Sequence, residues 1–516
     1  MDPGMLGRLA RDLVGFLRAP ITADQAEGLV RARLARREES FLRMAGEMIY
    51  AHPRSPYRHL LRAAGCEYGD LAALVEREGL DGALTRLADA GVCVTFDEFK
   101  GREETVRGSQ RFTFAEADFD NPRVRHHFEA RSGGTRGEGT VVKISLEFVG
   151  DLAASTALAL RAHDLSQHDH VIWLMGGVTP MLIYAKLARP PLAWFHPMRP
   201  LAFEVRAGAR YLAALSRLAA VPLPLPAFLD LADPGSLARW LAARLREGRR
   251  LCVTTYASSA VRVAVAALAQ GLALDGVTFI TLGEPFTEAK RRLLEAAGAR
   301  PLVRFAFTEA GIIGYQCATP QGPDDLHGFT DSFGLIRRRR AVGTDHLAVD
   351  AFLVTSLLPA APKILLNVES GDHGAMAQKR CGCGLGAVGL TTHLSEIRSF
   401  EKLSGEDMTF VQTDLLRILE EVLPARFGGT AADFQVVEEE QQGILRLVLI
   451  ISPRVGSIDE AGARRVFIEE IEKRGGFPQM GARTWQGADT VGVRRQWPVA
   501  TRAGKILPFH LVKGRG

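Results

Sequence analysis

The chain has 516 residues, of which 47% are hydrophobic and 24% charged, and this length and composition predict a globular protein with two or more domains. The net charge of +5 comes from charges spread along the chain, so we expect no binding of nucleic acid. No apolar run reaches the roughly 18 residues that a membrane span needs, and the first residues are too charged for a signal peptide. The six cysteines make no disulfide framework in so long a chain, so we expect a cytoplasmic protein.

The first part of the chain, to about residue 90, is expected to be a helical lead-in. Leu, Ala and Arg recur there at helical spacing, as in residues 71–87. A stretch rich in glycine and hydroxyl residues, 131–140, then precedes an alternating apolar segment, 141–146. Backbone N–H groups in such a stretch are free to bind phosphate oxygens, whereas a flexible surface loop is the alternative interpretation.

Between about residues 150 and 300, helices alternate with short apolar strands. The expected strands are residues 170–175, 251–255 and 277–282, and the expected helices are residues 236–246, 259–270 and 287–297. This alternation predicts an α/β fold with a parallel sheet, whose ligands bind beyond the carboxyl ends of the strands. Gly283, Glu284 and Pro285 lie at one such end. Residues 305–309, Phe-Ala-Phe-Thr-Glu, lie at the next, where an apolar run meets a hydroxyl and a carboxylate.

Beyond about residue 400 the composition favours a small separate α+β domain. The expected elements are helix 413–423, strands 434–438 and 445–451, helix 459–473 and a strand near Val491. Close to the end, residues 498–508 form a short basic turn that contains Lys505. A solvated tail is the alternative interpretation of this turn.

Four side chains with metal-binding chemistry occur in two separated pairs. Cys381 and Cys383 lie on a glycine-rich turn, and Cys317 and His327 lie upstream, after the Phe-Ala-Phe-Thr-Glu segment. Three thiolates and one imidazole would complete a tetrahedral Zn²⁺ site with no open position, so such a metal would be structural. Two surface thiols on a glycine turn are the alternative interpretation.

The motifs occur together in the order, and at about the spacing, of the adenylate-forming enzymes, and from about residue 45 onward the chain resembles their phenylacetate-CoA ligase branch. The motifs that carry the resemblance are the phosphate loop at 132–140, Gly-Glu-Pro at 283–285, the adenine-stacking loop at 305–309, Ser-Gly-Asp at 370–372, the hinge at 398–401 and Gly-Lys-Ile at 504–506. In that branch a Cys and a His after the adenine-stacking loop, with a Cys-x-Cys after the Gly-Asp motif, form a zinc site.

The resemblance implies an α/β fold with a large multi-subdomain N-terminal adenylation domain, residues 1–397, and a small mobile α+β C-terminal lid domain, residues 398–516. It implies that Lys505, Glu309 and Thr308 are catalytic residues, with Lys505 as the adenylation lysine and Glu309 as the ligand of Mg²⁺. It also implies that Glu401 belongs to the hinge. One hard carboxylate oxygen suits Mg²⁺, which prefers few protein ligands plus phosphate oxygens. The expected ATP-binding residues are Ser132, Gly133, Gly134, Thr135, Arg136, Gly137, Thr140, Gly283, Glu284, Pro285, Phe305, Ala306, Phe307, Asp372 and Arg398.

The sequence also departs from the pattern of the family. The phosphate loop has Arg136 where a second Thr is common, Glu138 for the usual Lys and Gly139 for Pro, and the hinge has Phe400 and Glu401 for two Asp residues. An acidic residue beside a polyphosphate costs Coulomb energy unless it turns outward, so we expect Arg136 to replace the missing cation. These departures leave open whether the acceptor thiol is ordinary CoA.

Two further groups of residues are candidates for substrate contacts. Trp173, Met175, Gly176, Thr255 and Tyr256 lie at or near strand ends and are candidates for the acid pocket, with apolar core as the alternative for Trp173 and Met175. Four consecutive arginines, residues 337–340, are interpreted as a solvated edge, with a site for the 3′-phosphate of CoA as the alternative.

The function that the resemblance implies is an acid–thiol ligase. It would use ATP to convert a carboxylic acid, expected to be aryl or arylacetic, to an acyl-adenylate and transfer the acyl group to CoA. The alternatives are transfer to a carrier protein, an enzyme cysteine or an amine, and a non-catalytic nucleotide-binding homologue. The expected ligands and partners are ATP, Mg²⁺, structural Zn²⁺, a small carboxylic acid, and CoA or a carrier protein, and a homodimer is left open.

Overall fold

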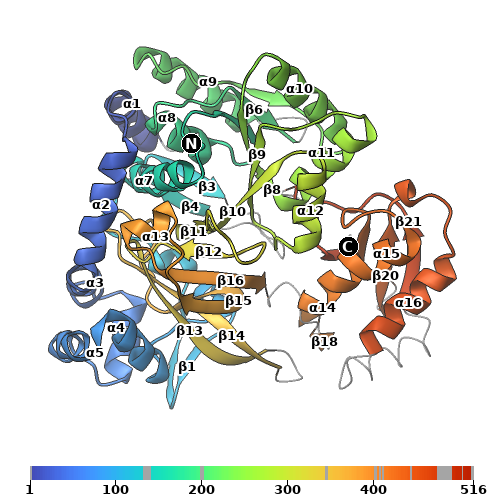
Figure 1. The fold of residues 1–516 in the computed structure, drawn as a ribbon. Coiled ribbons are helices and arrows are strands. Elements are labelled where there is room, and N and C mark those ends of the chain that lie inside the picture. Colours follow the sequence, from blue (N-terminus) through green and yellow to red (C-terminus); the bar gives the residue numbers. More distant parts are fainter. Residues whose placement is uncertain are drawn as a thin grey trace.

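The computed structural model describes residues 3–131, 141–197, 203–342, 347–399, 404–405, 408–409, 412–441, 444–472, 491–501 and 504–512. The described residues form a large part, up to residue 399, and a smaller C-terminal part, from residue 404 onward, and the two lie side by side (Figure 1). Each part has a buried apolar core of its own. No described helix is long and apolar enough to cross a membrane.

The N-terminal lead-in is helical, as the spacing of its apolar residues predicts. Its elements are α1 (Pro3–Arg18), α2 (Ala23–Ala35), α3 (Arg37–Met44), a π-helical turn (Ala45–Tyr50), α4 (Pro56–Ala63) and α5 (Tyr68–Asp89). Thr22 and Gln25 form a capping box that starts α2, which satisfies backbone N–H groups at the helix end. Gly79 has φ +68 inside α5 and marks a kink there.

A twelve-stranded sheet organises the large part, with strand order β13-β14-β15-β16-β12-β11-β10-β9-β8-β5-β6-β7 among the described residues. Its strands are β5 (Asp169–Trp173), β6 (Ala193–His196), β7 (Pro226–Phe228), β8 (Leu251–Tyr256), β9 (Val277–Leu282), β10 (Arg300–Phe307), β11 (Gly311–Gln316), β12 (Leu326–Gly328), β13 (Phe333–Val342), β14 (Leu347–Ser356), β15 (Val368–Gln378) and β16 (Thr392–Ser399). Strands β5 to β10 pair in parallel, which confirms the predicted parallel sheet. The other neighbouring pairs, β10–β11, β11–β12, β12–β16, β16–β15, β15–β14 and β14–β13, are antiparallel.

Helices cover both faces of the parallel half of the sheet. The face toward α7 (Leu146–Ala162), α8 (Val178–Lys186) and α9 (Phe203–Leu218) buries Cys252 and Ile280. The face toward α10 (Pro234–Arg246), α11 (Ala257–Ala269) and α12 (Glu288–Ala296) buries Val253 and Phe279. Successive strand residues point to opposite faces, so both faces of these strands must be apolar.

The remaining elements of the large part are short, and most of them connect the lead-in to the sheet. They are α6 (Phe96–Phe99), β1 (Thr105–Arg107), β2 (Gln110–Phe112), a 3₁₀ turn (Glu116–Phe119), β3 (Phe128–Arg131), β4 (Val141–Ile144) and, between β15 and β16, α13 (Gly384–Val388). The alternating apolar segment 141–146 is a strand only as far as Ile144. Ser145 accepts a hydrogen bond from the backbone N–H of Phe148 and starts α7, so the apolar run continues as a helix.

The C-terminal part has the predicted α+β composition. Its described elements are β17 (Ser404–Gly405), β18 (Met408–Thr409), α14 (Gln412–Arg417), a π-helical turn (Ile418–Val422), α15 (Leu423–Phe427), β19 (Phe434–Gln441), β20 (Ile444–Ile451), a 3₁₀ turn (Pro453–Val455), α16 (Glu460–Glu472), β21 (Val491–Arg495) and β22 (Phe509–Val512). The larger sheet has the order β21-β20-β19-β22. The expected domain boundary, between residues 397 and 398, falls inside β16.

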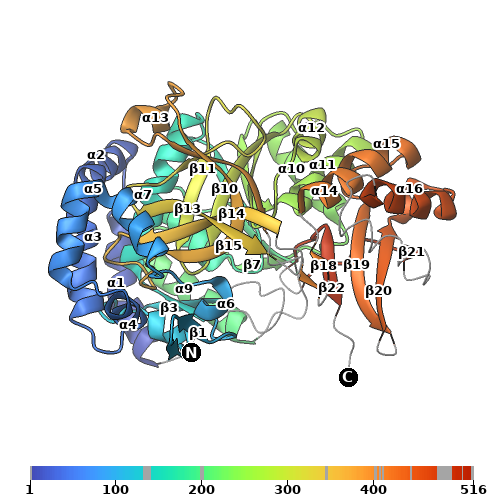
Figure 2. The same ribbon diagram turned by 90° about the horizontal axis from the view of Figure 1, so that it is seen from below.

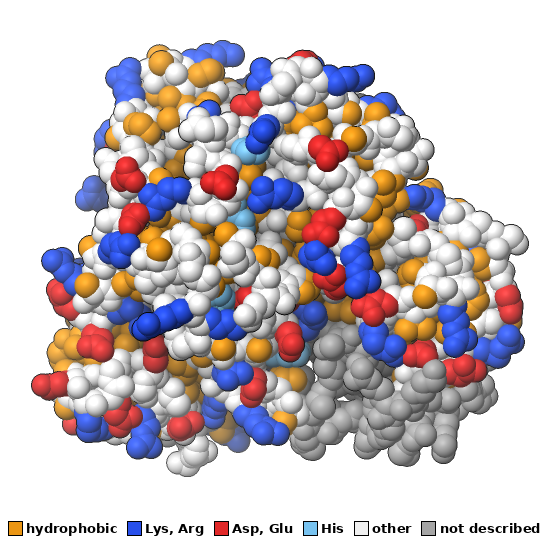
Figure 3. Space-filling model, in the orientation of Figure 1, with side chains coloured by type: hydrophobic (Ala, Val, Ile, Leu, Met, Phe, Trp, Pro, Cys, Tyr) orange, Lys and Arg blue, Asp and Glu red, His pale blue; other side chains and the backbone are white. Residues whose placement is uncertain are grey.

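The C-terminal part lies beside α11 and α12 of the large part in both ribbon views (Figures 1 and 2). This is the side on which β8 and β9 end. Basic and acidic side chains are interspersed over the face seen in Figure 3, in agreement with the mixed charge pattern of the sequence. The arrangement brings the end of the chain to the sheet edge where the sequence motifs predict a ligand.

Candidate active site

Lys505 reaches the large part from a tight turn near the end of the chain. The backbone N–H of Lys505 donates to the Thr501 hydroxyl at 3.1 Å, the N–H of Thr501 donates to the carbonyl of Lys505 at 2.7 Å, and Gly504 has φ +84. The Lys505 ammonium lies 5.4 Å from the centroid of the Tyr256 ring. It lies so close to Gly283 that a Cβ added there would meet Nζ at 2.9 Å and make the lysine shift, and the φ of +74 at this position also favours glycine.

Glu284 attaches the Lys505 turn to the large part. Its carboxylate accepts hydrogen bonds from the backbone N–H of Ser258 at 2.6 Å, from the Ser258 hydroxyl at 2.9 Å and from the backbone N–H of Ile506 at 3.1 Å. Burial raises the pKa of Glu284, and the neighbouring Lys290 and the Ser258 hydrogen bonds oppose that rise. Expected as an ATP-binding residue, Glu284 in this structure joins the two parts of the protein beside Lys505. Pro285, also expected there, accepts a hydrogen bond from Lys290 through its carbonyl.

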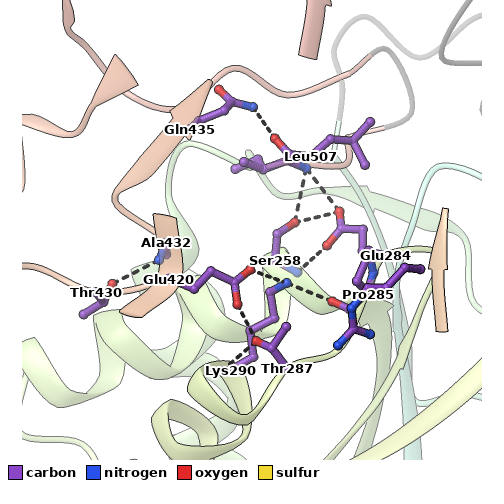
Figure 4. A network of polar contacts seen from close by, with 12 residues as sticks. Ser258, Glu284, Pro285, Thr287, Lys290, Glu420, Thr430, Ala432, Gln435 and Leu507 are labelled. Atoms are coloured by element: carbon purple, nitrogen blue, oxygen red, sulfur yellow. Dashed lines mark hydrogen bonds and ion pairs between the residues drawn. The ribbon is translucent and has the colours of Figure 1, made fainter. Parts of the chain in front are cut away.

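A second group of contacts surrounds this junction (Figure 4). Glu420 of the C-terminal part forms an ion pair with Lys290 of α12 at 2.8 Å and accepts a hydrogen bond from the Thr287 hydroxyl. Both members of the ion pair are buried. Gln435, on β19, donates to the carbonyl of Leu507 at 2.7 Å and accepts from the N–H of Val499 at 2.7 Å, so it holds both ends of the Lys505 turn.

Glu309 lies in the turn after β10, with Thr308 before it, and its side chain is only 9% exposed. Its carboxylate forms an ion pair with Lys100, which follows α6. The Lys100 ammonium lies 3.6 Å from the carboxylate of Glu116 and 5.3 Å from the centroid of the Phe99 ring. A buried carboxylate needs a positive partner, and here Lys100 provides it. Nothing in the local sequence around Lys100 predicts this contact.

Phe305, Ala306 and Phe307 end β10 and pair with the start of β11, with a bulge between Phe305 and Ala306. After the turn, Gly311 has φ +89, and a Cβ there would meet side chains of α7 at 2.8 Å. The turn that carries Glu309 is therefore held close to α7 and has little freedom to move. The structure places the whole segment, as expected, at the carboxyl end of a parallel strand.

Asp372 and Arg398 lie on neighbouring strands. Asp372 pairs in register with Ser399, and His373 pairs with Arg398, so both expected nucleotide-binding residues lie at one end of the β15–β16 pair. The Arg398 guanidinium donates to the carboxylate of Asp324 at 2.9 Å. That carboxylate also accepts the backbone N–H of Ile397 at 2.9 Å. Arg398 thus holds the strand that leads toward the C-terminal part.

The expected acid-pocket residues lie on two different faces of the sheet. Trp173 is fully buried in the core beneath α10 and α11, and its indole N–H donates to the carbonyl of Leu229 at 3.2 Å. Thr255 donates to the carbonyl of Trp173 at 2.9 Å and is also buried. Tyr256 packs on the opposite face, beneath Lys505. Met175 is half-buried and Gly176 is exposed in the loop after β5.

Several expected residues lie outside the described part of the chain. These are the phosphate-loop residues Ser132, Gly133, Gly134, Thr135, Arg136, Gly137 and Thr140, together with Glu401 of the hinge. Their roles remain predictions. The four arginines 337–340 lie on β13, where Arg337 is exposed and Arg340 forms an ion pair with the buried Glu369. The interpretation as a solvated edge therefore fits Arg337 and Arg339, which are exposed, but not Arg338 and Arg340, which are half-buried.

The four expected zinc ligands come together around His327. Its Nε2 atom lies 3.1 Å from the Sγ of Cys383 and 3.4 Å from the Sγ of Cys381. A hydrogen bond from the Cys317 thiol lowers the pKa of Cys383 and raises that of Cys317 itself. Thiolates are the form of cysteine that binds Zn²⁺. The donor set therefore fits a zinc ion.

His393 of β16 belongs to the same cluster and was not predicted from the sequence. The ligand atoms of Cys317, His327, Cys381 and His393 lie within 4.8 Å of one another. His393 Nδ1 contacts Asp325 at 2.7 Å and His327 Nδ1 contacts the carbonyl of Leu390 at 2.7 Å, which leaves Nε2 of each ring toward the cluster. The Nε2 of His393 is buried and has no hydrogen-bond partner in the described structure.

No protein-family model and no curated protein sequence matches the chain. Among solved structures it is similar to a 2-hydroxyisobutyryl-CoA ligase in complex with 2-HIB-AMP and CoA, with 14% identity and a TM-score of 0.46, over 96% of this chain and 91% of that one. It is similar to acetoacetyl-CoA synthetase from Streptomyces lividans, with 13% identity and a TM-score of 0.43, over 79% and 56%. It is also similar to the amide bond synthetase McbA from Marinactinospora thermotolerans, with 12% identity and a TM-score of 0.40, over 88% and 91%. Identities of 12–14% with TM-scores below 0.5 do not establish a function, which rests on the residues of the site.

Proposed function

We propose that the protein is an ATP-dependent ligase that converts a carboxylic acid to an acyl-adenylate and then transfers the acyl group to a thiol. The proposed thiol is that of CoA. The observation that carries the proposal is the position of Lys505. A turn of the C-terminal part presents its ammonium at the carboxyl ends of β8 and β9, against Gly283 and Tyr256. In sheets of this kind ligands bind beyond those strand ends.

The charges at this edge suit the adenylation step. Attack of a carboxylate on a phosphate brings anions together, so the site needs cations aimed at the charge that develops. Lys505 supplies one such cation. Lys505 belongs to the C-terminal part, which has its own core. Docking of that part therefore completes the site, and undocking removes the positive charge of Lys505 from it.

Glu309 fits a role as a magnesium ligand, because a carboxylate oxygen at a strand end can share the ion with phosphate oxygens. When bound, Mg²⁺ would neutralise phosphate charge. In the present structure Lys100 pairs with that carboxylate. Lys100 must therefore release Glu309 before a metal can bind there, and meanwhile it keeps a buried carboxylate neutralised.

The cysteine and histidine cluster fits a structural zinc site. It joins the segment after β11 to the segment between β15 and β16, and it is made of residues of the large part alone. Zinc there would hold the loops on the Glu309 side of the sheet in place. We assign it no step of the reaction, since any four of the five side chains of the cluster would leave no open position on a tetrahedral metal.

A panel of carboxylic acids, including aryl and arylacetic acids, tests the proposal through pyrophosphate release with and without CoA. Acid-dependent release is expected from the wild-type chain, and release that rises with CoA would identify the thiol acceptor. Release that CoA leaves unchanged would favour a carrier protein, an enzyme cysteine or an amine as acceptor. Nucleotide binding without pyrophosphate release for any acid would contradict the enzyme and leave a nucleotide-binding protein.

A further inference from the structure

Arg304 is a buried cation in the middle of β10. Arg304 is 7% exposed, and its Nε atom has no hydrogen-bond partner among the described residues. Tyr315 on β11 pairs in register with Arg304, so the two side chains lie on the same face of the sheet. No carboxylate of the described residues forms an ion pair with it, so the positive charge is left without an anion in the described structure.

Two other half-buried arginines of the large part, Arg398 and Arg107, are paired with carboxylates. The Arg398 guanidinium meets Asp324 at 2.9 Å, and the Arg107 guanidinium meets Glu98 at 2.8 Å. Removing an ion from water without a partner costs several kcal/mol, which is why buried charges in proteins are normally paired. Arg304 therefore needs a partner that the described chain does not contain.

The position of Arg304 indicates where that partner comes from. Arg304 pairs in register with Leu282, the residue before Gly283, and Leu282 pairs with Tyr256. The residues on this face of the strands pack against α7 and α8. Arg304 thus lies one strand away from the residues that contact Lys505, and it lies deeper in the protein than the ammonium does.

The polar groups around Arg304 are already engaged with one another. The hydroxyl of Tyr184 lies 2.6 Å from that of Thr254, and the hydroxyl of Tyr315 lies 3.2 Å from that of Thr156. Neither pair carries a negative charge that could balance the guanidinium. Among these neighbouring side chains of the described structure, only Arg304 carries a charge that attracts an anion.

We propose that the acid activated by this protein carries a second anionic group, a carboxylate, which binds Arg304 while the reacting carboxylate faces Lys505. This inference rests on the proposed function and specifies its substrate class. A guanidinium binds a carboxylate through two parallel hydrogen bonds, so the same contact fixes the orientation of the acid. An acid with an apolar tail would leave the charge of Arg304 unpaired, and the site discriminates against it.

The test compares matched acids on the wild-type chain and on two variants. The pairs are glutarate with pentanoate, adipate with hexanoate, and terephthalate with 4-methylbenzoate. Wild type should prefer the dicarboxylate of at least one pair in acid-dependent pyrophosphate release, and Arg304→Leu should lower kcat/KM for that acid about a hundredfold. Arg304→Lys should retain part of the preference, and the exposed Arg300→Leu on the same strand should retain all of it.

Binding of the free acids, measured by calorimetry without ATP, separates this inference from the proposed function. Dicarboxylate binding that Arg304→Leu abolishes would support the subsite even if no acid releases pyrophosphate. Equal use of both members of every pair, or a preference that survives in Arg304→Leu, would overturn it. A variant that loses thermal stability and binds no differently would show instead that the chain itself supplies the partner of Arg304.

Discussion

The Lys505 turn and the cysteine and histidine cluster bring distant residues together in different ways. The cluster is built from β11, β12, β16 and the turn before α13, all of which belong to one sheet and its loops. The Lys505 turn belongs to a part with its own core and reaches the large part through contacts at its surface. One group of residues is therefore fixed by the fold, whereas the other is fixed only while two cores stay docked.

Several of the docking contacts that surround Lys505 are polar. They include the ion pair between Glu420 and Lys290 and the hydrogen bond from Ile506 to Glu284. Polar contacts between domains can be exchanged for water at modest cost. The cluster lies within one part of the protein: His327 and His393 can separate only if strands of the large sheet do, and Cys381 and Cys383 lie on the turn before α13. The Lys505 turn is therefore suited to docking and undocking during a reaction cycle, whereas the cysteine and histidine cluster is suited to a structural role.

The largest expected effect is on adenylation by Lys505→Ala. Removing a cation aimed at developing charge should lower acyl-adenylate formation by about 10²- to 10³-fold, while nucleotide affinity stays close to that of wild type because the lysine acts mainly on the transition state. Single-turnover formation of the adenylate and nucleotide titration measure the two quantities. Arg465→Ala, an exposed charge of the same part, is the control. A loss below about tenfold, or roughly 1.4 kcal/mol, would remove Lys505 from the reaction.

Glu309→Gln should have the next largest effect. The amide keeps the size of the side chain and removes the charge that binds the metal, so turnover should fall about a hundredfold and need more Mg²⁺. The fold should persist, as circular dichroism would show. Glu116→Gln, which also faces Lys100, is the matched control and should leave the Mg²⁺ requirement unchanged. Normal activity of Glu309→Gln at low Mg²⁺ would refute the assignment.

Glu420→Gln tests the docking contacts without altering Lys505. It leaves the buried Lys290 without its carboxylate, so the docked arrangement should be less populated and adenylation should fall by about two- to tenfold. Replacing Lys290 by Met in the same chain should recover part of the loss, because the unpaired charge is then gone. Glu421→Gln, exposed and adjacent, is the control. An effect as large as that of Lys505→Ala would mean that Glu420 acts in the chemistry itself.

The cluster should show the smallest effect on catalysis and a clear effect on stability. The wild-type chain should hold one zinc, with sulfur at about 2.3 Å and nitrogen at about 2.0 to 2.1 Å. Replacing Cys381 and Cys383 by Ser should give zinc-poor protein with a lower melting temperature and only indirectly reduced activity. Cys66→Ser, at a cysteine far from the cluster, should change neither. Elemental analysis that finds well under one zinc per chain in wild-type protein purified without chelator would count against the site.

Local patterns in the sequence account for much of the fold. The helices of the lead-in, the strands that begin near residues 170, 251 and 277, and the alternation of elements in the C-terminal part are confirmed by the structure. Each rests on the spacing of apolar residues within a few turns or a few strand positions, which a sequence displays directly. The end of β4 at Ile144 has no signal in composition, because the apolar run continues into α7 without a break.

Motif order in the sequence also predicted which residues meet. Cys317, His327, Cys381 and Cys383 come together as expected, and Lys505 lies beside Gly283. The contacts made through space by residues outside any motif could not be predicted. Among them are Lys100 on Glu309, His393 in the cluster and Gln435 across the Lys505 turn.

By itself, then, the sequence determined the classes of local structure and the candidate chemistry of its motifs, since both depend on residues close together in the chain. Only the tertiary structure decided that Glu284 joins two domains, that Lys100 neutralises Glu309 and that Arg304 lies buried with no carboxylate paired to it among the described residues. The physical reason is that charge pairing depends on distance and on exclusion from water, and both are set by which strands and domains pack together.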